Sequence, residues 1–248
     1  MITAAALYQA IDVTWPPAAL HDTGPWLVRE GRGGGSRVSA ATLRDYDTNS
    51  PSPAEEDIHL AENGMRGIGQ TPLFMVRDGE GALDQALARR GYSISKPVTL
   101  YAIPTAALAI EKPPPVTCFT VWEPLQIMCD IWAVGGIDAA RIAVMDRVTT
   151  AKTGLFGRIN NKPAAAGFIA MDGPIAMLHA LEVLPEHRRQ GLARHMMRAA
   201  AFWAQDQGAE FVSVLVTDDN TGANDLYRGL GMSPVAAYHY RERTETAE

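Results

Sequence analysis

The chain of 248 residues has few cysteines, no long apolar run and no excess of positive charge. Its two cysteines, Cys118 and Cys129, are too few for a disulfide framework, and no stretch resembles a signal peptide, so we expect buried, reduced thiols in a cytoplasmic protein. No apolar run approaches the roughly 18 residues that indicate a membrane span. The net charge of −6 argues against a general nucleic-acid binder.

Hydrophobic residues make up 47% of the chain, which supports a sizeable core. The prolines of Glu111–Pro115 mark a break, because they stiffen a connector and cannot continue a helix. We therefore predict two domains, residues 1–112 and residues 116–248.

The second half has the clearer pattern of elements. Apolar residues at helical spacing predict helices, and apolar runs between turn residues predict strands. In chain order we expect helices over 119–134 and 138–148, a hairpin of 153–160 with 162–171, a strand over 175–183, a helix over 191–207, and strands over 211–216 and 235–241.

The stretch Leu178–Ala193 predicts a strand, a tight turn and the start of a helix. The turn has the order Arg188-Arg189-Gln190-Gly191-Leu192-Ala193. Backbone N–H groups and the positive end of a helix would converge there, beside guanidinium groups. Gly191 lets the backbone approach an anion closely, and Ala193 keeps the first helical turn slim. This combination predicts a pyrophosphate-binding turn.

A second motif follows the predicted strand Phe211–Val216. Asn220 is a candidate N-cap for the next helix, and Gly231 is a candidate terminator. Tyr227 lies between them. Alone, this tyrosine would be interpreted as a packing residue of an amphipathic helix, whereas its spacing from the upstream turn favours a functional role.

The turn resembles the acetyl-CoA-binding signature (R/Q)-x-x-G-x-(G/A) of the GCN5-related N-acetyltransferase (GNAT) superfamily, and it follows a strand that ends in Val183-Leu184-Pro185. The second motif is similar to the family's N-x-x-A-x-x-L-Y-x-x-x-G-F segment, matched by Asn220, Ala223, Leu226, Tyr227 and Gly231, with Met232 in place of Phe. The resemblance implies the GNAT fold, which is an α/β fold with a mixed sheet flanked by helices. It also implies an enzyme that transfers an acetyl group from acetyl-CoA to a primary amine and releases CoA.

The resemblance also implies roles for residues of both motifs. The family's splayed strand corresponds to His179–Val183, whose backbone would contact the pantetheine arm and the thioester. Tyr227 would protonate the departing CoA thiolate. The residues expected at the cofactor are Leu181, Val183, Arg188, Arg189, Gln190, Gly191, Leu192, Ala193, Arg194, Asn220 and Tyr227. No metal site is expected.

His179 and Glu182 are alternative candidates for the base that deprotonates the amine, and a water relay is a third alternative. Strict strand alternation places the two side chains on opposite faces, so both cannot serve unless a bulge intervenes. The ordinary histidine pKa of about 6.5 favours His179. The string LHALEVLPEHRRQG also resembles the arylalkylamine acetyltransferases, which carry a catalytic histidine at the position of His179 and alanine at that of Glu182.

The first half shows the same spacing of predicted strands and helices as the second half when the two are aligned with Val76 on Val216, although few residues are identical. The functional positions differ: Leu87 replaces Tyr227, Glu80 replaces Asn220, Ser39 replaces His179, and Thr48–Pro53 replaces the anion turn. We therefore predict a tandem arrangement in which the N-terminal half is a degenerate GNAT-like copy without a pyrophosphate site.

A non-catalytic acyl-CoA-binding regulatory module is the alternative function. Retention of Tyr227 and of a candidate base in one half, with loss of both in the other, favours catalysis. The acceptor is a small-molecule amine or a peptide amine, and the sequence does not distinguish between them.

Overall fold

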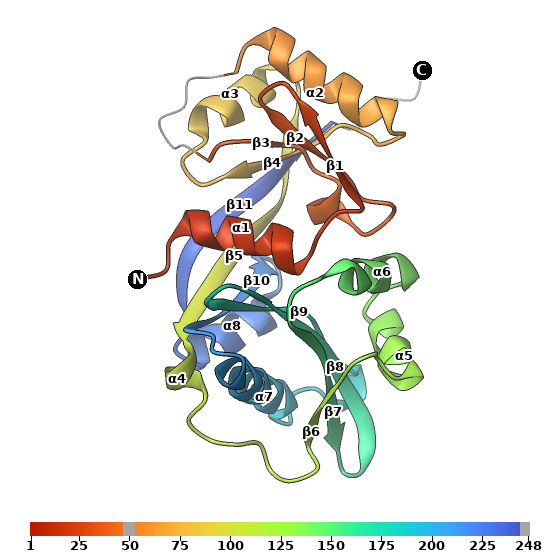
Figure 1. Cartoon of the computed structure of the whole chain (residues 1–248), viewed down its shortest axis with the longest axis vertical. Helices are drawn as coiled ribbons and strands as arrows, with labels where there is room; N and C mark the ends of the chain where they lie inside the picture. Colours follow the sequence, from red (N-terminus) through yellow and green to blue (C-terminus); the bar gives the residue numbers. More distant parts are fainter. Residues whose placement is uncertain (47–52, 244–248) are drawn as a thin grey trace. The chain divides into compact units, whose positions relative to one another are not determined.

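The computed structural model describes residues 1–46 and 53–243, which form two compact units (Figure 1). Unit 1 consists of Met1–Pro16 and Leu100–Val235, and unit 2 consists of Pro17–Thr99 and the chain from Ala236 onward. The predicted break at Glu111–Pro115 lies inside unit 1, so the compact units do not coincide with residues 1–112 and 116–248. The reason is that the first helix packs with the later part of the chain and the last strand packs with the earlier part.

Unit 1 contains a mixed sheet in the order β5-β10-β9-β8-β7-β6. Its strands are β6 (Cys118–Val121), β7 (Lys152–Ile159), β8 (Lys162–Asp172), β9 (Ile175–Val183), β10 (Phe211–Thr217) and residues 100–104 of β5 (Ser93–Pro104). β9 runs parallel to β10, whereas β6, β7, β8 and β9 are antiparallel in turn. The predicted α/β fold class is confirmed.

Helices cover both faces of this sheet. They are α1 (Ala4–Thr14), α4 (Thr105–Leu108), α5 (Gln126–Val134), α6 (Ala139–Arg147), α7 (Leu192–Asp206) and α8 (Thr221–Gly229). α1 and α5 pack on β8 and β9, and α7 packs on strands β6 to β10. Among the described helices, none combines the length and the apolar character that crossing a membrane requires.

The helix predicted over residues 119–134 is correct only in its second part. Residues 118–121 instead form β6, which pairs with β7 from Cys118↔Gly157 to Val121↔Gly154. Pairing with a distant strand therefore outweighs the helical spacing of this segment. Both cysteines are half-buried and free, and burial raises the pKa of the Cys118 thiol to about 12.

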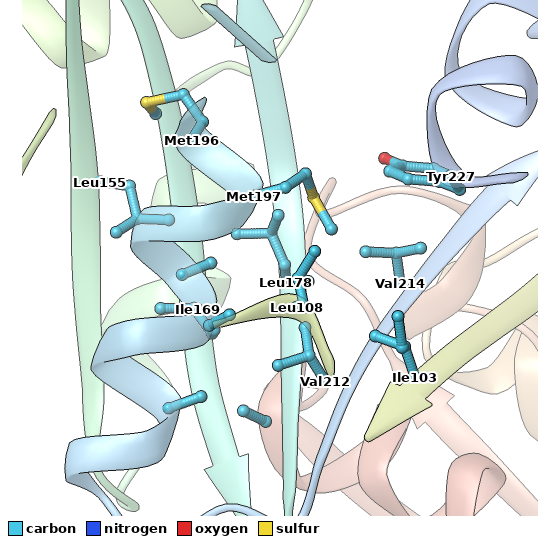
Figure 2. Close-up of a cluster of buried hydrophobic side chains, with 14 of the residues drawn as sticks. Ile103, Leu108, Leu155, Ile169, Leu178, Met196, Met197, Val212, Val214 and Tyr227 are labelled. Carbon is cyan, nitrogen blue, oxygen red and sulfur yellow. The ribbon is translucent and has the colours of Figure 1, made fainter. Parts of the chain in front are cut away.

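The core of unit 1 lies between α7 and the sheet (Figure 2). Leu192, Met196, Met197 and Ala200 recur on one face of α7 and are buried. Gly157 of β7 lies directly beneath this face, since a Cβ there would stand 2.7 Å from Sδ of Met196. The close approach of helix and strand fixes where α7 begins, and with it the turn that precedes α7.

Unit 2 has a separate core. Its elements are β1 (Ala19–Thr23), β2 (Trp26–Glu30), the short 3₁₀ helix η1 (Ser36–Val38), β3 (Thr42–Leu43), α2 (Glu55–Gly67), β4 (Leu73–Arg77), α3 (Gly81–Arg89) and most of β11 (Ser233–Glu242). β1, β2 and β3 form an antiparallel sheet, and β4 pairs with β11. Trp26, Phe74 and Tyr92 pack edge to face at its centre.

Element bounds in the two halves correspond when Val76 is placed on Val216. α3 (Gly81–Arg89) then falls on α8 (Thr221–Gly229), and Ser93 at the start of β5 falls on Ser233 at the start of β11. This correspondence supports the proposal of a second, partial copy. Most of Thr48–Pro53, the counterpart of the anion turn, lies outside the described residues, so the predicted lack of a pyrophosphate site there stays a prediction.

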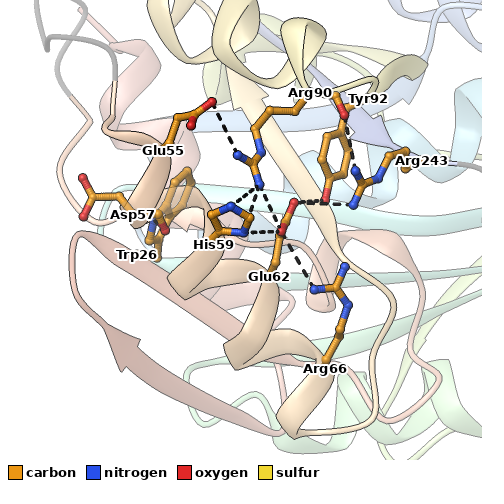
Figure 3. Close-up of polar contacts among 9 residues, drawn as sticks. All are labelled: Trp26, Glu55, Asp57, His59, Glu62, Arg66, Arg90, Tyr92 and Arg243. Carbon is orange, nitrogen blue, oxygen red and sulfur yellow. Dashed lines mark hydrogen bonds and ion pairs between the residues drawn. The ribbon is translucent and has the colours of Figure 1, made fainter.

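A buried carboxylate connects three segments of unit 2: α2, the turn at residues 90–92 and the chain after β11 (Figure 3). Glu62 of α2 is 2% exposed and accepts a hydrogen bond from the Tyr92 hydroxyl at 2.8 Å. Arg90, Arg243 and Arg66 lie 3.3, 3.7 and 3.9 Å from its oxygens. Burial alone would raise the pKa of Glu62, but the Tyr92 hydrogen bond and these arginine charges hold it below its usual value.

Asp84 of α3 is expected to make unit 2 sensitive to acid. Arg241 of β11 donates from Nε and Nη2 to its two oxygens at 2.7 and 2.8 Å. These bonds, with a contact from His239, lower the pKa of Asp84 despite partial burial. A lowered carboxyl pKa contributes stability that is complete above the unfolded-state pKa of about 4 and is lost as the pH falls through the folded-state value.

Asp84→Asn should therefore reduce the free energy of unfolding at pH 7 by roughly 2 kcal/mol, and the difference from wild type should shrink below pH 4. Urea unfolding curves at pH 7 and at pH 3 measure both quantities. A difference that is the same at both pH values would show that the charge of Asp84 is not the stabilising feature.

Candidate active site

The turn between β9 and α7 presents a row of backbone donors. After a 3₁₀ turn at Pro185–His187, Arg189 and Gly191 adopt left-handed conformations with φ of 63° and 82°. Among the described residues, the N–H groups from Arg189 to Arg194 donate to no backbone or side-chain acceptor, and the first N–H bonded at this end of α7 is that of His195. Such a row at a helix N-terminus is suited to an anion.

Gly191 leaves the centre of this turn open. A Cβ there would meet no atom within 4 Å, and the positive φ is one that side-chain-bearing residues rarely adopt. Leu192 is buried beneath the turn, while Arg189, Gln190 and Arg194 are exposed around it. The turn therefore combines open space at Gly191 with a row of unpaired N–H groups.

Arg188 does not point into the turn. Its Nε donates to the carbonyl oxygen of Val183 at 2.9 Å, and its Nη2 donates to Oε1 of Glu182 at 2.9 Å. The guanidinium thus binds the end of β9. Of the two arginines that the sequence predicts beside the anion, Arg189 is the one without such a contact to β9 among the described residues.

Strands β9 and β10 separate within the sheet. Their parallel pairing starts at Ile175↔Phe211 and ends at Leu178↔Val214, although β9 continues to Val183 and β10 to Thr217. Beyond Leu178, β9 keeps its pairing with β8. One edge of residues 179–183 is therefore not paired with β10, which is the splayed geometry that the resemblance implies for a thioester-binding strand.

A bulge in this stretch changes the predicted faces of the two candidate bases. β8 advances from Phe168 to Ala166 while β9 advances from His179 to Glu182, so β9 holds one extra residue. Ala180 in the bulge has a φ of 51°. The bulge replaces strict alternation, and both His179 and Glu182 point to the face covered by α1 and α5.

His179 is enclosed by residues of α1 and of the sheet. The residue is 4% exposed, and Nε2 lies 2.8 Å from Oγ1 of Thr14. The rings of Trp15 and Phe168 lie at centroid distances of 5.0 and 6.4 Å. The sequence-predicted histidine is therefore held in one orientation.

Glu182 lies between the end of α5 and the turn. Its carboxylate is paired with Arg188, and its side chain is 16% exposed. A Cβ at Gly135 would stand 2.4 Å from Oε2, so any other residue at the C-terminal end of α5 would displace the Glu182 side chain. Gly135, the C-cap of α5, thus also leaves room for the carboxylate.

Tyr227 of α8 combines a packed ring with an unpaired hydroxyl. The residue is 6% exposed within the core of unit 1, and Figure 2 shows its ring beside Val214. Burial raises the pKa of Tyr227 to about 12, so the phenol keeps its proton at neutral pH. Its hydroxyl has no hydrogen-bond partner among the described residues.

Comparison with known proteins identifies the segment that carries these features. Residues 131–232 match the model of the Acetyltransferase (GNAT) family. This segment belongs to the GNAT superfamily. Its membership implies acetyl-CoA-dependent transfer of an acetyl group to an amine, and the mixed sheet with its flanking helices is the GNAT fold.

A protein similar in sequence and two solved structures of similar fold agree with this assignment. The chain is 26% identical over 241 residues to "Uncharacterized N-acetyltransferase YobR" of Bacillus subtilis (strain 168), covering 92% of this chain and 94% of the relative. Its fold is similar to that of a GCN5-related N-acetyltransferase from Kribbella flavida, with a TM-score of 0.78, 18% identity and coverage of 98% and 97% of the two chains. A tandem GNAT protein from the clavulanic acid biosynthesis pathway has a TM-score of 0.63 and 13% identity, with coverage of 95% and 86%.

Asn220 is the N-cap of α8, as the sequence predicts. Its side-chain oxygen accepts from the N–H of Ala223 at 3.1 Å. Sequence reasoning missed its neighbour Asn224, which is buried, donates to the carbonyl oxygens of Thr217 and Asn220, and accepts from the Tyr101 hydroxyl at 3.0 Å. These bonds hold α8, and therefore Tyr227, against the sheet.

The residues around His179 lie partly outside the GNAT-matched segment. Thr14 and Trp15 come from α1 and its C-cap, and no sequence signal connects them to a histidine 165 positions away. Among the described residues, no group of histidine, cysteine or carboxylate side chains could hold a metal ion.

Proposed function

We propose that the chain is an acetyl-CoA-dependent N-acetyltransferase with one site, built from β9, the turn Arg188–Ala193 and α8. The observation that carries this proposal is the row of unpaired N–H groups from Arg189 to Arg194 beside the open side of Gly191. These groups would bind the pyrophosphate of acetyl-CoA. Leu181 and Val183 would offer backbone groups to the pantetheine arm along the unpaired edge of β9.

The reaction needs one proton acceptor and one proton donor. Acetyl-CoA supplies an acetyl group activated as a thioester. The acceptor amine forms a C–N bond to the carbonyl carbon, and the C–S bond breaks. His179 takes the proton that the amine loses, and Tyr227 donates its phenolic proton to the sulfur of the leaving thiolate. The phenolate then recovers a proton from solvent and the imidazolium of His179 releases one to solvent, so the enzyme returns to its starting state.

His179 is the proposed base because it lies where β9 separates from β10. Glu182 is the alternative, since the bulge brings its side chain to the same face. Oε1 of Glu182 already accepts a hydrogen bond from Arg188, which favours a role for Glu182 in holding the turn.

The acceptor is proposed to be a primary amine of a small molecule or a peptide. The two free cysteines and the acidic net charge of −6 support a reducing compartment such as the cytoplasm and an acceptor other than nucleic acid. The N-terminal half is proposed to be a degenerate copy that does not bind acetyl-CoA.

The deciding experiment is a screen of primary amines with acetyl-CoA in which release of the free CoA thiol is monitored. Acetyl transfer to an amine, verified by mass spectrometry of the product, supports the enzyme. Tight binding of acetyl-CoA without thiol release above the rate of hydrolysis, across small amines and peptides, would instead support the regulatory binding module.

His179→Gln should lower kcat/KM by roughly 10²-fold near neutral pH and flatten the acidic limb of the pH profile. The defect should shrink as the pH rises, because more of the amine is then already neutral. Glu182→Gln is the matched control and should leave the acidic limb in place. An acidic limb that survives in His179→Gln and disappears in Glu182→Gln would assign the base to the carboxylate.

A further inference from the structure

A buried hydroxyl determines which nitrogen of His179 carries hydrogen. Thr14, the last residue of α1, is fully buried, and its Oγ1 lies 2.5 Å from the carbonyl oxygen of Ala10 and 2.8 Å from Nε2 of His179. A carbonyl oxygen can only accept, and a hydroxyl has one hydrogen to give. The Thr14 hydrogen therefore goes to Ala10, and Nε2 of His179 must be the donor to Oγ1.

This direction of donation fixes the tautomer. A neutral imidazole carries hydrogen on one nitrogen only, so with hydrogen on Nε2 the basic lone pair is on Nδ1. The ring has little freedom to exchange its nitrogens, since it is 4% exposed and in contact with Trp15 and Phe168. Loss of the Thr14 oxygen would remove the acceptor that lies 2.8 Å from Nε2, which disfavours this tautomer.

We propose that Thr14 is a positioning residue of the acetyltransferase, holding His179 as the Nε2–H tautomer so that Nδ1 takes the proton of the acceptor amine. The inference rests on the proposed role of His179 as base. On proton transfer, the N–H bond of the amine breaks and an Nδ1–H bond forms, while Nε2–H stays on Thr14. The hydroxyl oxygen thus continues to accept from the ring and stabilises the imidazolium, as a third group does in other catalytic constellations.

The inference makes α1 a part of the active site. Residues 4–14 lie outside the GNAT-matched segment 131–232, yet they belong to the same compact unit and pack on β8 and β9. Besides packing on the sheet, α1 would therefore supply Thr14, the residue that positions His179.

The test combines NMR with kinetics on the full chain. In protein labelled with ¹⁵N in histidine, the two ring nitrogens of His179 have shifts that distinguish the Nε2–H from the Nδ1–H tautomer, and His179→Gln assigns the signals. We expect Nε2–H in the wild type and in Thr14→Ser, which keeps the hydroxyl. Thr14→Val keeps the shape and removes the hydroxyl, and we expect it to show mixed tautomers and a kcat lower by at least about tenfold, with unchanged affinity for acetyl-CoA.

Three outcomes would overturn the inference: an Nδ1–H signal in the wild type, an unchanged tautomer in Thr14→Val, or a rate in Thr14→Ser as low as in Thr14→Val. The wild-type spectrum is decisive even where the valine variant does not fold. If the tautomer shifts as expected but both Thr14→Val and His179→Gln keep the wild-type rate, the role of His179 as base fails while the hold of Thr14 on the ring stands.

Discussion

Replacing Gly191 with aspartate is expected to abolish binding of acetyl-CoA. The wild type should bind one molecule per chain, at the row of unpaired N–H groups in the turn before α7. The new carboxylate would project into the open space at Gly191, from a backbone with φ of 82° that favours glycine, and would face the phosphates. Like charges in such proximity cost several kcal/mol, so affinity should fall on the order of 10³-fold. Isothermal titration calorimetry measures both stoichiometry and affinity.

Two controls separate charge from backbone strain. Gly191→Asn has nearly the same size without the charge and tolerates a left-handed backbone, so it should weaken binding far less. Gly208→Asp lies past the other end of α7 with φ of 83° and an equally open Cβ direction, and it should bind as the wild type does. Two equivalent sites per chain, or unchanged affinity in Gly191→Asp, would refute the single site at this turn.

Tyr227→Phe should lower kcat by roughly 10²-fold or more with little change in the affinity for acetyl-CoA. Phenylalanine keeps the ring in the core and removes only the hydroxyl, which has no partner among the described residues. With a pKa of about 12, the tyrosine keeps its proton throughout the assay range, so it can act as an acid without adding its own alkaline limb. Steady-state kinetics of thiol release measures the effect.

Tyr101→Phe is the matched control for this variant. Tyr101 lies 6.0 Å from Tyr227 between ring centroids and donates to Asn224 instead of presenting its hydroxyl to the site. It should lose about 1 kcal/mol of stability and keep most of its turnover. Wild-type turnover in Tyr227→Phe would assign Tyr227 to packing alone.

Local chemistry explains why the turn and α8 could be predicted from the sequence. The left-handed Gly191, the cap at Asn220 and the hairpin turn at Asn160-Asn161 each depend on a residue type whose backbone or hydrogen-bonding preference acts within a few positions. These features need no knowledge of distant contacts.

The features that could not be predicted depend on distant partners. The bulge occurs at Ala180, which has a positive φ although it is not a glycine. No residue type in the sequence therefore indicates that the side chains of His179 and Glu182 lie on the same face of the sheet. β6 forms because β7 pairs with it, against its own helical spacing. The units depart from the predicted domains because α1 and β11 each pack far from their neighbours in sequence.

The path of the chain between the units has a consequence for synthesis on the ribosome. Leu7, Ile11 and Trp15 are buried by β8, β9 and their neighbours, and Thr14 precedes its partner His179 by 165 residues. At about 5–20 residues per second, translation takes on the order of 10–30 s to produce the sheet that covers this helix. During that interval the apolar side chains of residues 4–15 lack the sheet that buries them in the folded protein, so unit 1 cannot complete its core before β8 and β9 have been synthesised.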